Sequence, residues 1–111
     1  MAGERIQVLF ARSGPVFAVR VEDPSMSPKL EEGSYLIIDP EVRFSRFEGG
    51  IGVVAHEGRF KVRHVYAVGG SYILVPSNPA YYPEVVPADS AQVFHVALYM
   101  PAWADMRDSE R

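Results

Sequence analysis

Short apolar runs, rich in β-branched residues and separated by glycine and proline, limit most strongly how this chain can fold. Residues 16–21 read Val-Phe-Ala-Val-Arg-Val, a β-branched pattern that favours a strand. Residues 34–39, Ser-Tyr-Leu-Ile-Ile-Asp, form a second run, which ends at Pro40. Nine glycines and nine prolines interrupt such runs at short intervals, and no segment has an amphipathic helical pattern. The predicted strands are residues 16–21, 34–39, 51–56, 59–65, 72–75 and 93–100.

A two-glycine turn is predicted between the strands at 59–65 and 72–75. Residues 68–71, Val-Gly-Gly-Ser, are a typical hairpin signal. Within the first of these strands, successive side chains point to opposite sides of the sheet. Lys61 and Arg63 are therefore expected to share one face.

The chain has the size of one domain. Its 111 residues are 48% hydrophobic and 23% charged, which is ordinary for a globular domain that buries its own core. We expect a mainly β domain whose sheet is barrel-like or strongly bent. Residues 1–15 are predicted to be an N-terminal arm or linker, residues 16–101 the domain, and residues 102–111 a charged, frayed tail.

Composition excludes several kinds of site and partner. Cysteine is absent, so disulfides, thiolate catalysis and cysteine-based zinc sites are ruled out. The net charge of −3 argues against nucleic-acid binding by this chain itself, because duplex DNA selects a basic face. No stretch approaches the ~18 consecutive apolar residues of a spanning helix, and residues 1–20 do not resemble a signal peptide. We expect a cytoplasmic protein with no membrane partner and no cofactor.

A polar loop after the first predicted strand contains the sequence Pro24-Ser25-Met26-Ser27-Pro28. The prolines fix φ close to Ser25, and a rigid loop at a strand end is a good place to hold a nucleophile. Most serines in such loops only cap or turn the chain. The residues alone therefore favour a structural role for Ser25 over a catalytic one.

Four blocks extend this observation. Residues 23–26 read Asp-Pro-Ser-Met and are followed at 33–39 by Gly-Ser-Tyr-Leu-Ile-Ile-Asp. Residues 58–65 read Gly-Arg-Phe-Lys-Val-Arg-His-Val, residues 74–83 Leu-Val-Pro-Ser-Asn-Pro-Ala-Tyr-Tyr-Pro, and residues 93–98 Val-Phe-His-Val-Ala-Leu. In this order the blocks resemble the self-cleaving C-terminal peptidase domains of LexA, UmuD and lambda-type phage repressors. The resemblance implies the LexA-like peptidase fold.

The resemblance also implies a serine nucleophile and a base. In this family a serine attacks a peptide carbonyl and a neutral lysine takes its proton, since burial lowers the pKa of that lysine. Ser25 matches the serine, where Pro24 replaces the usual aspartate. Matching the second block without gaps places Arg63 at the lysine position. Arginine stays protonated at physiological pH and is a poor proton acceptor.

Lys61 is the alternative base. It lies two residues before Arg63 on the same face, roughly 6.6 Å along the strand at about 3.3 Å per residue. A register shift or bulge of two residues would keep its facing and bring it into place.

These assignments predict a repressor-type C-terminal domain that acts in transcriptional regulation, for example in an SOS response, through a homodimer. Its self-cleavage is expected to be absent or impaired. The alternative is an active serine–lysine autoprotease or peptidase, either of the LexA and UmuD kind or of the signal-peptidase kind. Signal peptidases have a Ser-Met-x-Pro box, and residues 25–28 fit this pattern. A UmuD-like polymerase accessory subunit is a third possibility. The domain's own linker is a possible peptide substrate, and DNA contact is expected only through a domain outside this chain.

Other candidate sites carry weaker signals. The three histidines, His56, His64 and His95, have irregular spacing and no acidic or cysteine partner at ligand spacing, so we expect no metal site. Ala2-Gly3 matches the family's Ala-Gly cleavage pair, but two-residue matches are common by chance.

Aromatic residues could stack on single-stranded nucleic acid, although core packing and an interface explain them better. These aromatic residues are Tyr66, Tyr72, Tyr81, Tyr82 and Phe94, and the residues expected at a dimer contact are Leu98, Tyr99, Met100 and Trp103.

Overall fold

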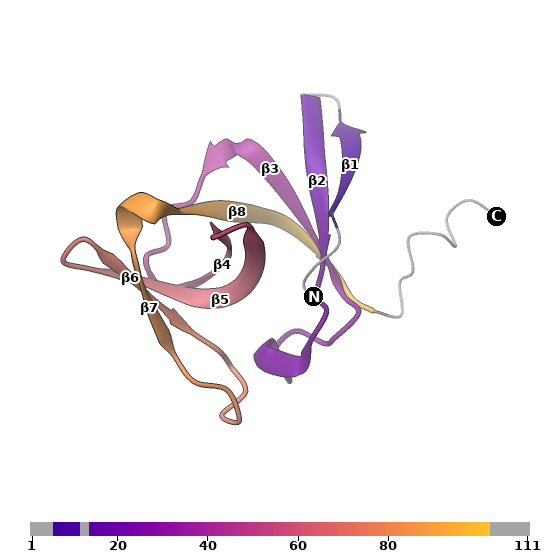
Figure 1. The fold of residues 1–111 in the computed structure, drawn as a ribbon. Coiled ribbons are helices and arrows are strands. Elements are labelled where there is room, and N and C mark those ends of the chain that lie inside the picture. The colour runs from indigo at the N-terminus through magenta and orange to yellow at the C-terminus, as the bar shows by residue number, and fades with distance from the viewer. Residues whose placement is uncertain (1–5, 12–13, 103–111) are drawn as a thin grey trace.

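In the part of the chain that the structure describes, eight antiparallel strands form a single bent sheet, and two short 3₁₀ helices lie in the connections between strands (Figure 1). The computed structural model describes residues 6–11 and 14–102. No α-helix occurs within this part of the chain, and the predicted mainly β fold is confirmed. The elements are β1 (Ile6–Ala11), β2 (Gly14–Arg20), η1 (Pro24–Met26), β3 (Tyr35–Arg43), β4 (Glu48–His56), β5 (Arg59–Val68), β6 (Ser71–Val75), β7 (Glu84–Pro87), η2 (Ala88–Ser90) and β8 (Ala91–Met100).

The last strand lies in the middle of the sheet, whose order is β1-β2-β3-β8-β4-β5-β6-β7. The first residues of β8 pair with β4, and the later ones pair with β3. Two irregularities interrupt the β3–β8 ladder, one between Ile37 and Ile38 and one between Ile38 and Arg43. Such irregularities bend a strand and increase its twist. Strand β8 therefore connects the two halves of the sheet where it curves around the core (Figure 1).

Each predicted run overlaps a strand, but two strands were not predicted. Strand β1 lies in the segment predicted to be an arm or linker, and it pairs with β2 along its whole length. Strand β7 has only four residues, ends at Pro87 and pairs with β6 at one edge of the sheet. Proline is tolerated at such edges, where a missing ladder donor costs little.

The predicted two-glycine turn joins β5 to β6. Gly69 and Gly70 have φ values of 54° and 84°. Positive φ at both central residues is what the tight turn of a twisted hairpin requires, and glycine adopts it without steric cost. The prediction is confirmed.

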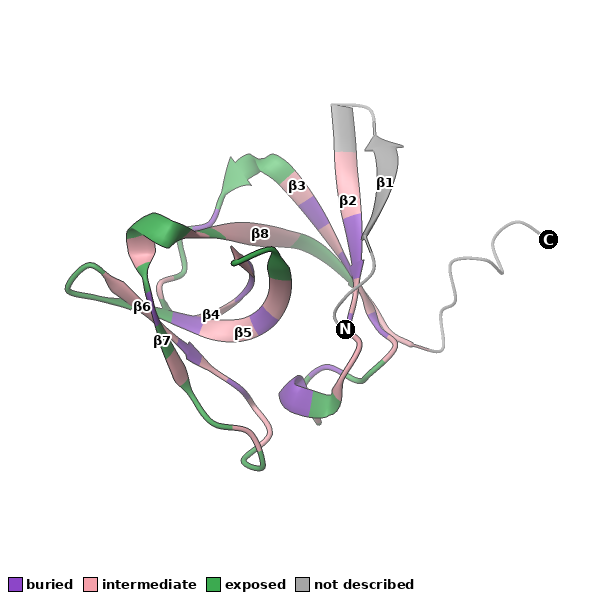
Figure 2. Ribbon diagram, in the orientation of Figure 1, coloured by how far each residue is buried: buried purple, intermediate pink, exposed green. Residues whose placement is uncertain are grey.

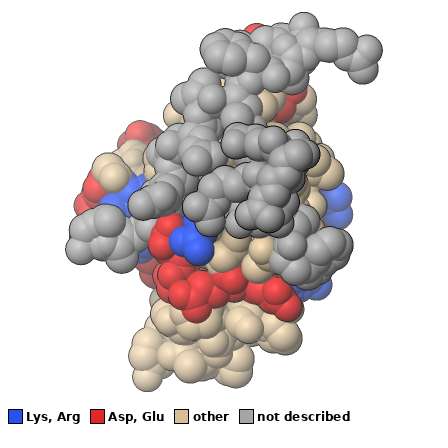
Figure 3. Space-filling model, turned by 90° about the vertical axis from the view of Figure 1, so that its right-hand side faces the viewer, with Lys and Arg blue, Asp and Glu red and all other residues tan. Residues whose placement is uncertain are grey.

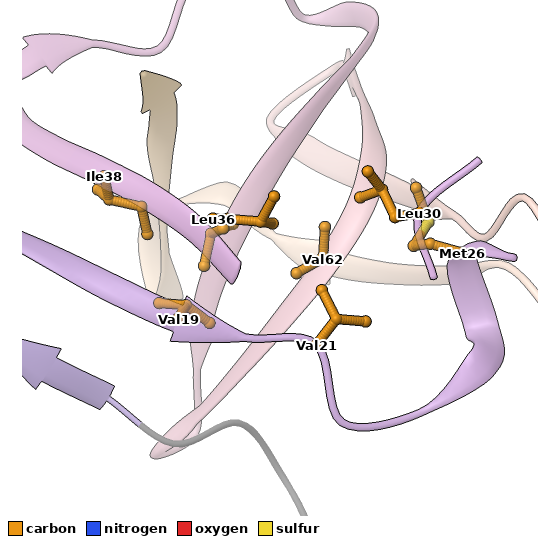
Figure 4. Packing of buried hydrophobic residues seen from close by; sticks show 8 residues of the cluster. Val19, Val21, Met26, Leu30, Leu36, Ile38 and Val62 are labelled. Carbon is orange, nitrogen blue, oxygen red and sulfur yellow. The ribbon is translucent and has the colours of Figure 1, made fainter. Parts of the chain in front are cut away.

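Two groups of buried side chains form the core (Figure 2). Strand β5 contributes to both, because Val62 belongs to one group and Val65 to the other. Both faces of β5 are therefore covered around these two residues, whereas the end of the strand at residues 66–68 is exposed. Figure 4 shows most of the first group, which consists of Val19, Val21, Met26, Leu30, Leu36, Ile38, Val53 and Val62. The second group consists of Phe44, Val54, Val65, Leu74 and Val86.

Candidate active site

Residues 21–34, which join β2 to β3 and are called the serine loop below, hold Ser25 in a fixed position. The side chain of Asp23 caps helix η1, since its Oδ1 accepts a hydrogen bond from Ser25 N at 3.0 Å. Pro24 occupies the start of η1, where a missing N–H costs nothing. Ser25 is 1% exposed and Met26 is fully buried in the core. The loop thus anchors the serine on both sides.

A second loop, residues 76–83 between β6 and β7, holds the serine loop from outside. Asn78 N donates to Ser25 O, and Asn78 Nδ2 donates to Pro24 O, each at 2.9 Å. Asn78 Oδ1 accepts from Ala80 N at 3.0 Å and so shapes its own loop. Asn78 was predicted only as a member of the block at residues 74–83, with no role of its own. Its position between prolines was the available signal, because an asparagine amide can replace backbone partners in such a loop.

Arg63 reaches Ser25 from β5. Its Nη1 lies 2.8 Å from Ser25 Oγ and 2.8 Å from the carbonyl oxygen of Val62. A guanidinium has five N–H donors and no acceptor. Arg63 therefore donates to the serine hydroxyl, and Ser25 Oγ is the acceptor in this contact. The structure brings these two predicted site residues together.

Lys61 is directed elsewhere. Its Nζ donates to Glu84 Oε1 on β7 at 2.7 Å, and the side chains of Lys61 and Glu84 are 28% and 37% exposed. The structure thus does not bring Lys61 to the serine.

The register of β5 explains this separation. Within the described residues, the β4–β5 ladder has a single shift, which lies between Glu48 and Gly50. The pairs on either side of Lys61 and Arg63 are regular. The two residues therefore keep their spacing of two positions, and the shift that would move Lys61 to the serine is not present.

The three histidines have separate surroundings. His56 Nε2 lies 3.9 Å from Glu57 Oε2, while the ring of His64 lies between Gly49 O and Ser77 Oγ. His95 belongs to β8. In residues 6–11 and 14–102, no group of three metal-ligating side chains is found.

The aromatic and dimer candidates are spread over several elements. The ring of Tyr72 stacks on Phe47 with a centroid separation of 5.4 Å, whereas Tyr82 is 88% exposed. On β8, Leu98 is 56% exposed and Tyr99 is 38% exposed. Trp103, the charged tail and the Ala2-Gly3 pair lie outside the described residues.

Figure 3 shows one face of the molecule, on which Asp and Glu side chains gather in a band with fewer basic side chains beside them. The part of the chain that the structure describes contains no helix long and apolar enough to cross a membrane.

Comparison with protein-family models relates this chain to known proteins. A family model described as Peptidase S24-like matches residues 4–97. The match extends over most of the chain and includes Ser25, Arg63 and Asn78. Comparison with curated proteins gave no significant match.

Proposed function

The chain belongs to the peptidase S24-like family, that of the LexA, UmuD and phage-repressor C-terminal domains, and from this premise we propose that it is a regulatory domain with absent or strongly impaired self-cleavage. The hydrogen bond from Arg63 Nη1 to Ser25 Oγ, 2.8 Å long, carries the proposal. Ser25 occupies the nucleophile position, and Arg63 occupies the position of the base.

The chemistry of the pair supports this proposal. A serine hydroxyl becomes a nucleophile when a neighbouring group accepts its proton as it attacks. Arginine offers donors only, so it holds Ser25 Oγ without being able to take that proton. The nearest lysine along β5 donates to Glu84 instead. Ser25 is thus positioned but not activated.

The regulatory role that we propose is dimerisation. A repressor-type domain that dimerises raises the effective concentration of paired DNA-binding domains. Leu98 and Tyr99 present apolar and aromatic surface on β8, and aromatic residues are enriched at interface cores. The acidic band in Figure 3 argues against DNA as a partner of the face shown there. DNA contact is assigned to a domain outside this chain.

The proposal is tested by incubating the protein between pH 7 and pH 10, alone and with a synthetic peptide containing Ala-Gly. Alkaline pH accelerates lysine-dependent cleavage because it deprotonates the base. We expect mass spectrometry to find no Ser25-dependent cleavage, so that the unaltered chain and Ser25→Ala give the same products.

A Ser25-dependent product from the unaltered chain would overturn the proposal in favour of the alternative, an active serine–lysine peptidase. Lys61→Met then identifies the base. Loss of that product in Lys61→Met would assign the proton transfer to Lys61.

A further inference from the structure

His64 and Ser77 form a second serine-containing pair, separate from Ser25 and Arg63. In the β5–β6 ladder, His64 lies opposite Val75. Ser77 follows two residues later, so an extended chain places it on the same face as Val75, diagonally across from the histidine. His64 Nε2 lies 2.7 Å from Ser77 Oγ. The register of the hairpin therefore brings a hydroxyl to an imidazole.

A bulge in β4 orients this imidazole. Between the pairs Glu48↔Tyr66 and Gly50↔Val65 of the β4–β5 ladder, Gly49 is an extra residue. It has a φ of 104°, and a Cβ at this position would lie 2.8 Å from the hydroxyl of Tyr66. The positive φ favours glycine, whereas the exposed Tyr66 side chain could shift to make room for a Cβ. The bulge leaves the Gly49 carbonyl oxygen 2.9 Å from His64 Nδ1.

The partners of the ring decide its tautomer. A carbonyl oxygen can only accept, so His64 Nδ1 carries the hydrogen in this contact. In the neutral imidazole, Nε2 then has the free lone pair and accepts a hydrogen bond from the hydroxyl of Ser77. The hydroxyl proton of Ser77 is thus directed at a group able to take it, which is the relationship that Ser25 and Arg63 lack.

We propose that Ser77 is a second nucleophile of this domain, activated by His64 and reactive towards activated acyl and phosphonyl compounds. The arrangement contains a nucleophile, a base within hydrogen-bond reach and a third group that orients the base. Both Ser77 and His64 are half-buried, and the exposed residues Pro79 and Ala80 follow in the same loop. Ser25, by contrast, is only 1% exposed.

The step that follows from this geometry is a substitution at phosphorus or at an acyl carbon. With a fluorophosphonate, Ser77 Oγ forms a bond to phosphorus and the P–F bond breaks. Fluoride leaves with the electron pair, and the serine proton moves to His64 Nε2. The Gly49 carbonyl stabilises the resulting imidazolium through the hydrogen on Nδ1.

The test uses an alkyl fluorophosphonate and the full chain, with the adduct located by peptide mass spectrometry. We expect one adduct, located on Ser77 and lost in Ser77→Ala. The control variant is Ser90→Ala, because Ser90 is an exposed serine whose hydroxyl donates only to a backbone carbonyl in the described structure. Ser90 is expected to remain unlabelled, and its variant to label like the unaltered chain.

The role of the imidazole is tested separately with His64→Asn. The asparagine amide keeps a donor near the place of Nδ1 and removes the base, so labelling is expected to fall about 100-fold, within the range of general base catalysis. His64→Gln, which reaches towards Ser77 without being able to take its proton, is the second variant if the first does not fold. No adduct on Ser77, or equal labelling rates in folded His64 variants, would overturn the inference. Neither result bears on whether Ser25 cleaves peptides.

Discussion

Arg63 and Ser25 are joined across 38 positions of sequence by a 2.8 Å hydrogen bond in which the guanidinium donates to the hydroxyl. The direction of this bond is opposite to the one that serine–lysine chemistry needs, in which the hydroxyl gives its proton to the base. The surrounding loop is held by Asp23 and Asn78, so the serine is kept in place. Under the proposed assignment, the site keeps the position of the nucleophile and lacks its proton acceptor.

The Ser25–Arg63 bond is expected to stabilise the fold modestly. In a double-mutant cycle with Ser25→Ala and Arg63→Met, we expect a coupling of about 1 kcal/mol, since a bond to a charged group is partly offset by solvation of a half-buried guanidinium. Urea denaturation of the four proteins measures it. Additive effects of the two substitutions would mean that the bond contributes nothing to stability.

Asn78 is expected to fix the serine loop through its side chain as well as its backbone. Asn78→Ala removes the donor to Pro24 O and the acceptor for Ala80 N, and we expect a loss of about 1–2 kcal/mol in the free energy of unfolding. Hydrogen exchange should quicken at the amide of Leu30, which donates within the serine loop.

Asn78→Asp is the matched control for that prediction. It keeps the acceptor for Ala80 N but replaces the donor with a carboxylate oxygen facing the Pro24 carbonyl. If it leaves exchange in the serine loop unchanged, the bond to Pro24 is not what fixes the loop.

Met26 links the serine loop to the core and should be sensitive to volume. Its side chain is fully buried in the group that includes Leu30 and Val62. Met26→Ala is expected to cost about 2–5 kcal/mol, because it leaves a cavity, whereas Met26→Leu should cost less than about 1.5 kcal/mol. Thermal or urea unfolding checks both. Similar losses for the two variants would argue against close packing at this position.

Dimerisation through β8 is tested by sedimentation analysis. We expect the unaltered protein to be a dimer and Leu98→Glu to be a monomer, since a charge on a buried interface is costly to desolvate. Val85→Glu on β7 is the control, because Val85 is 65% exposed on a different strand. A monomeric unaltered protein, or equal effects of the two substitutions, would contradict a dimer contact at β8.

Patterns local in sequence predicted much of the fold. Alternation and β-branching located six runs that overlap strands, and the Gly69–Gly70 pair predicted a turn whose positive φ values follow from glycine itself. Strand β1 was missed although its own sequence, Ile-Gln-Val-Leu-Phe-Ala, has the apolar, β-rich composition of a strand. Strand β7 carries a weak local signal, because it is short and ends in proline.

The site was predictable only in part. The shared face of Lys61 and Arg63 follows from strand period, but the direction of each long side chain depends on what lies opposite. Glu84 engages Lys61 from a strand that the sequence did not indicate, and the pairing of His64 with Ser77 depends on the β5–β6 register and on the bulge at Gly49. Such contacts between distant segments are set by tertiary structure and leave no local pattern.

In the proposed function, Arg63 prevents Ser25 from acting as a nucleophile. The most direct measurement compares the unaltered chain, Arg63→Lys and Arg63→Lys with Ser25→Ala, each incubated at alkaline pH with a synthetic Ala-Gly peptide. Mass spectrometry records the products. We expect cleavage by Arg63→Lys alone, because a lysine at this position can be neutral and take the serine proton. Ser25-dependent cleavage by the unaltered chain at the rate of Arg63→Lys would contradict the proposed function.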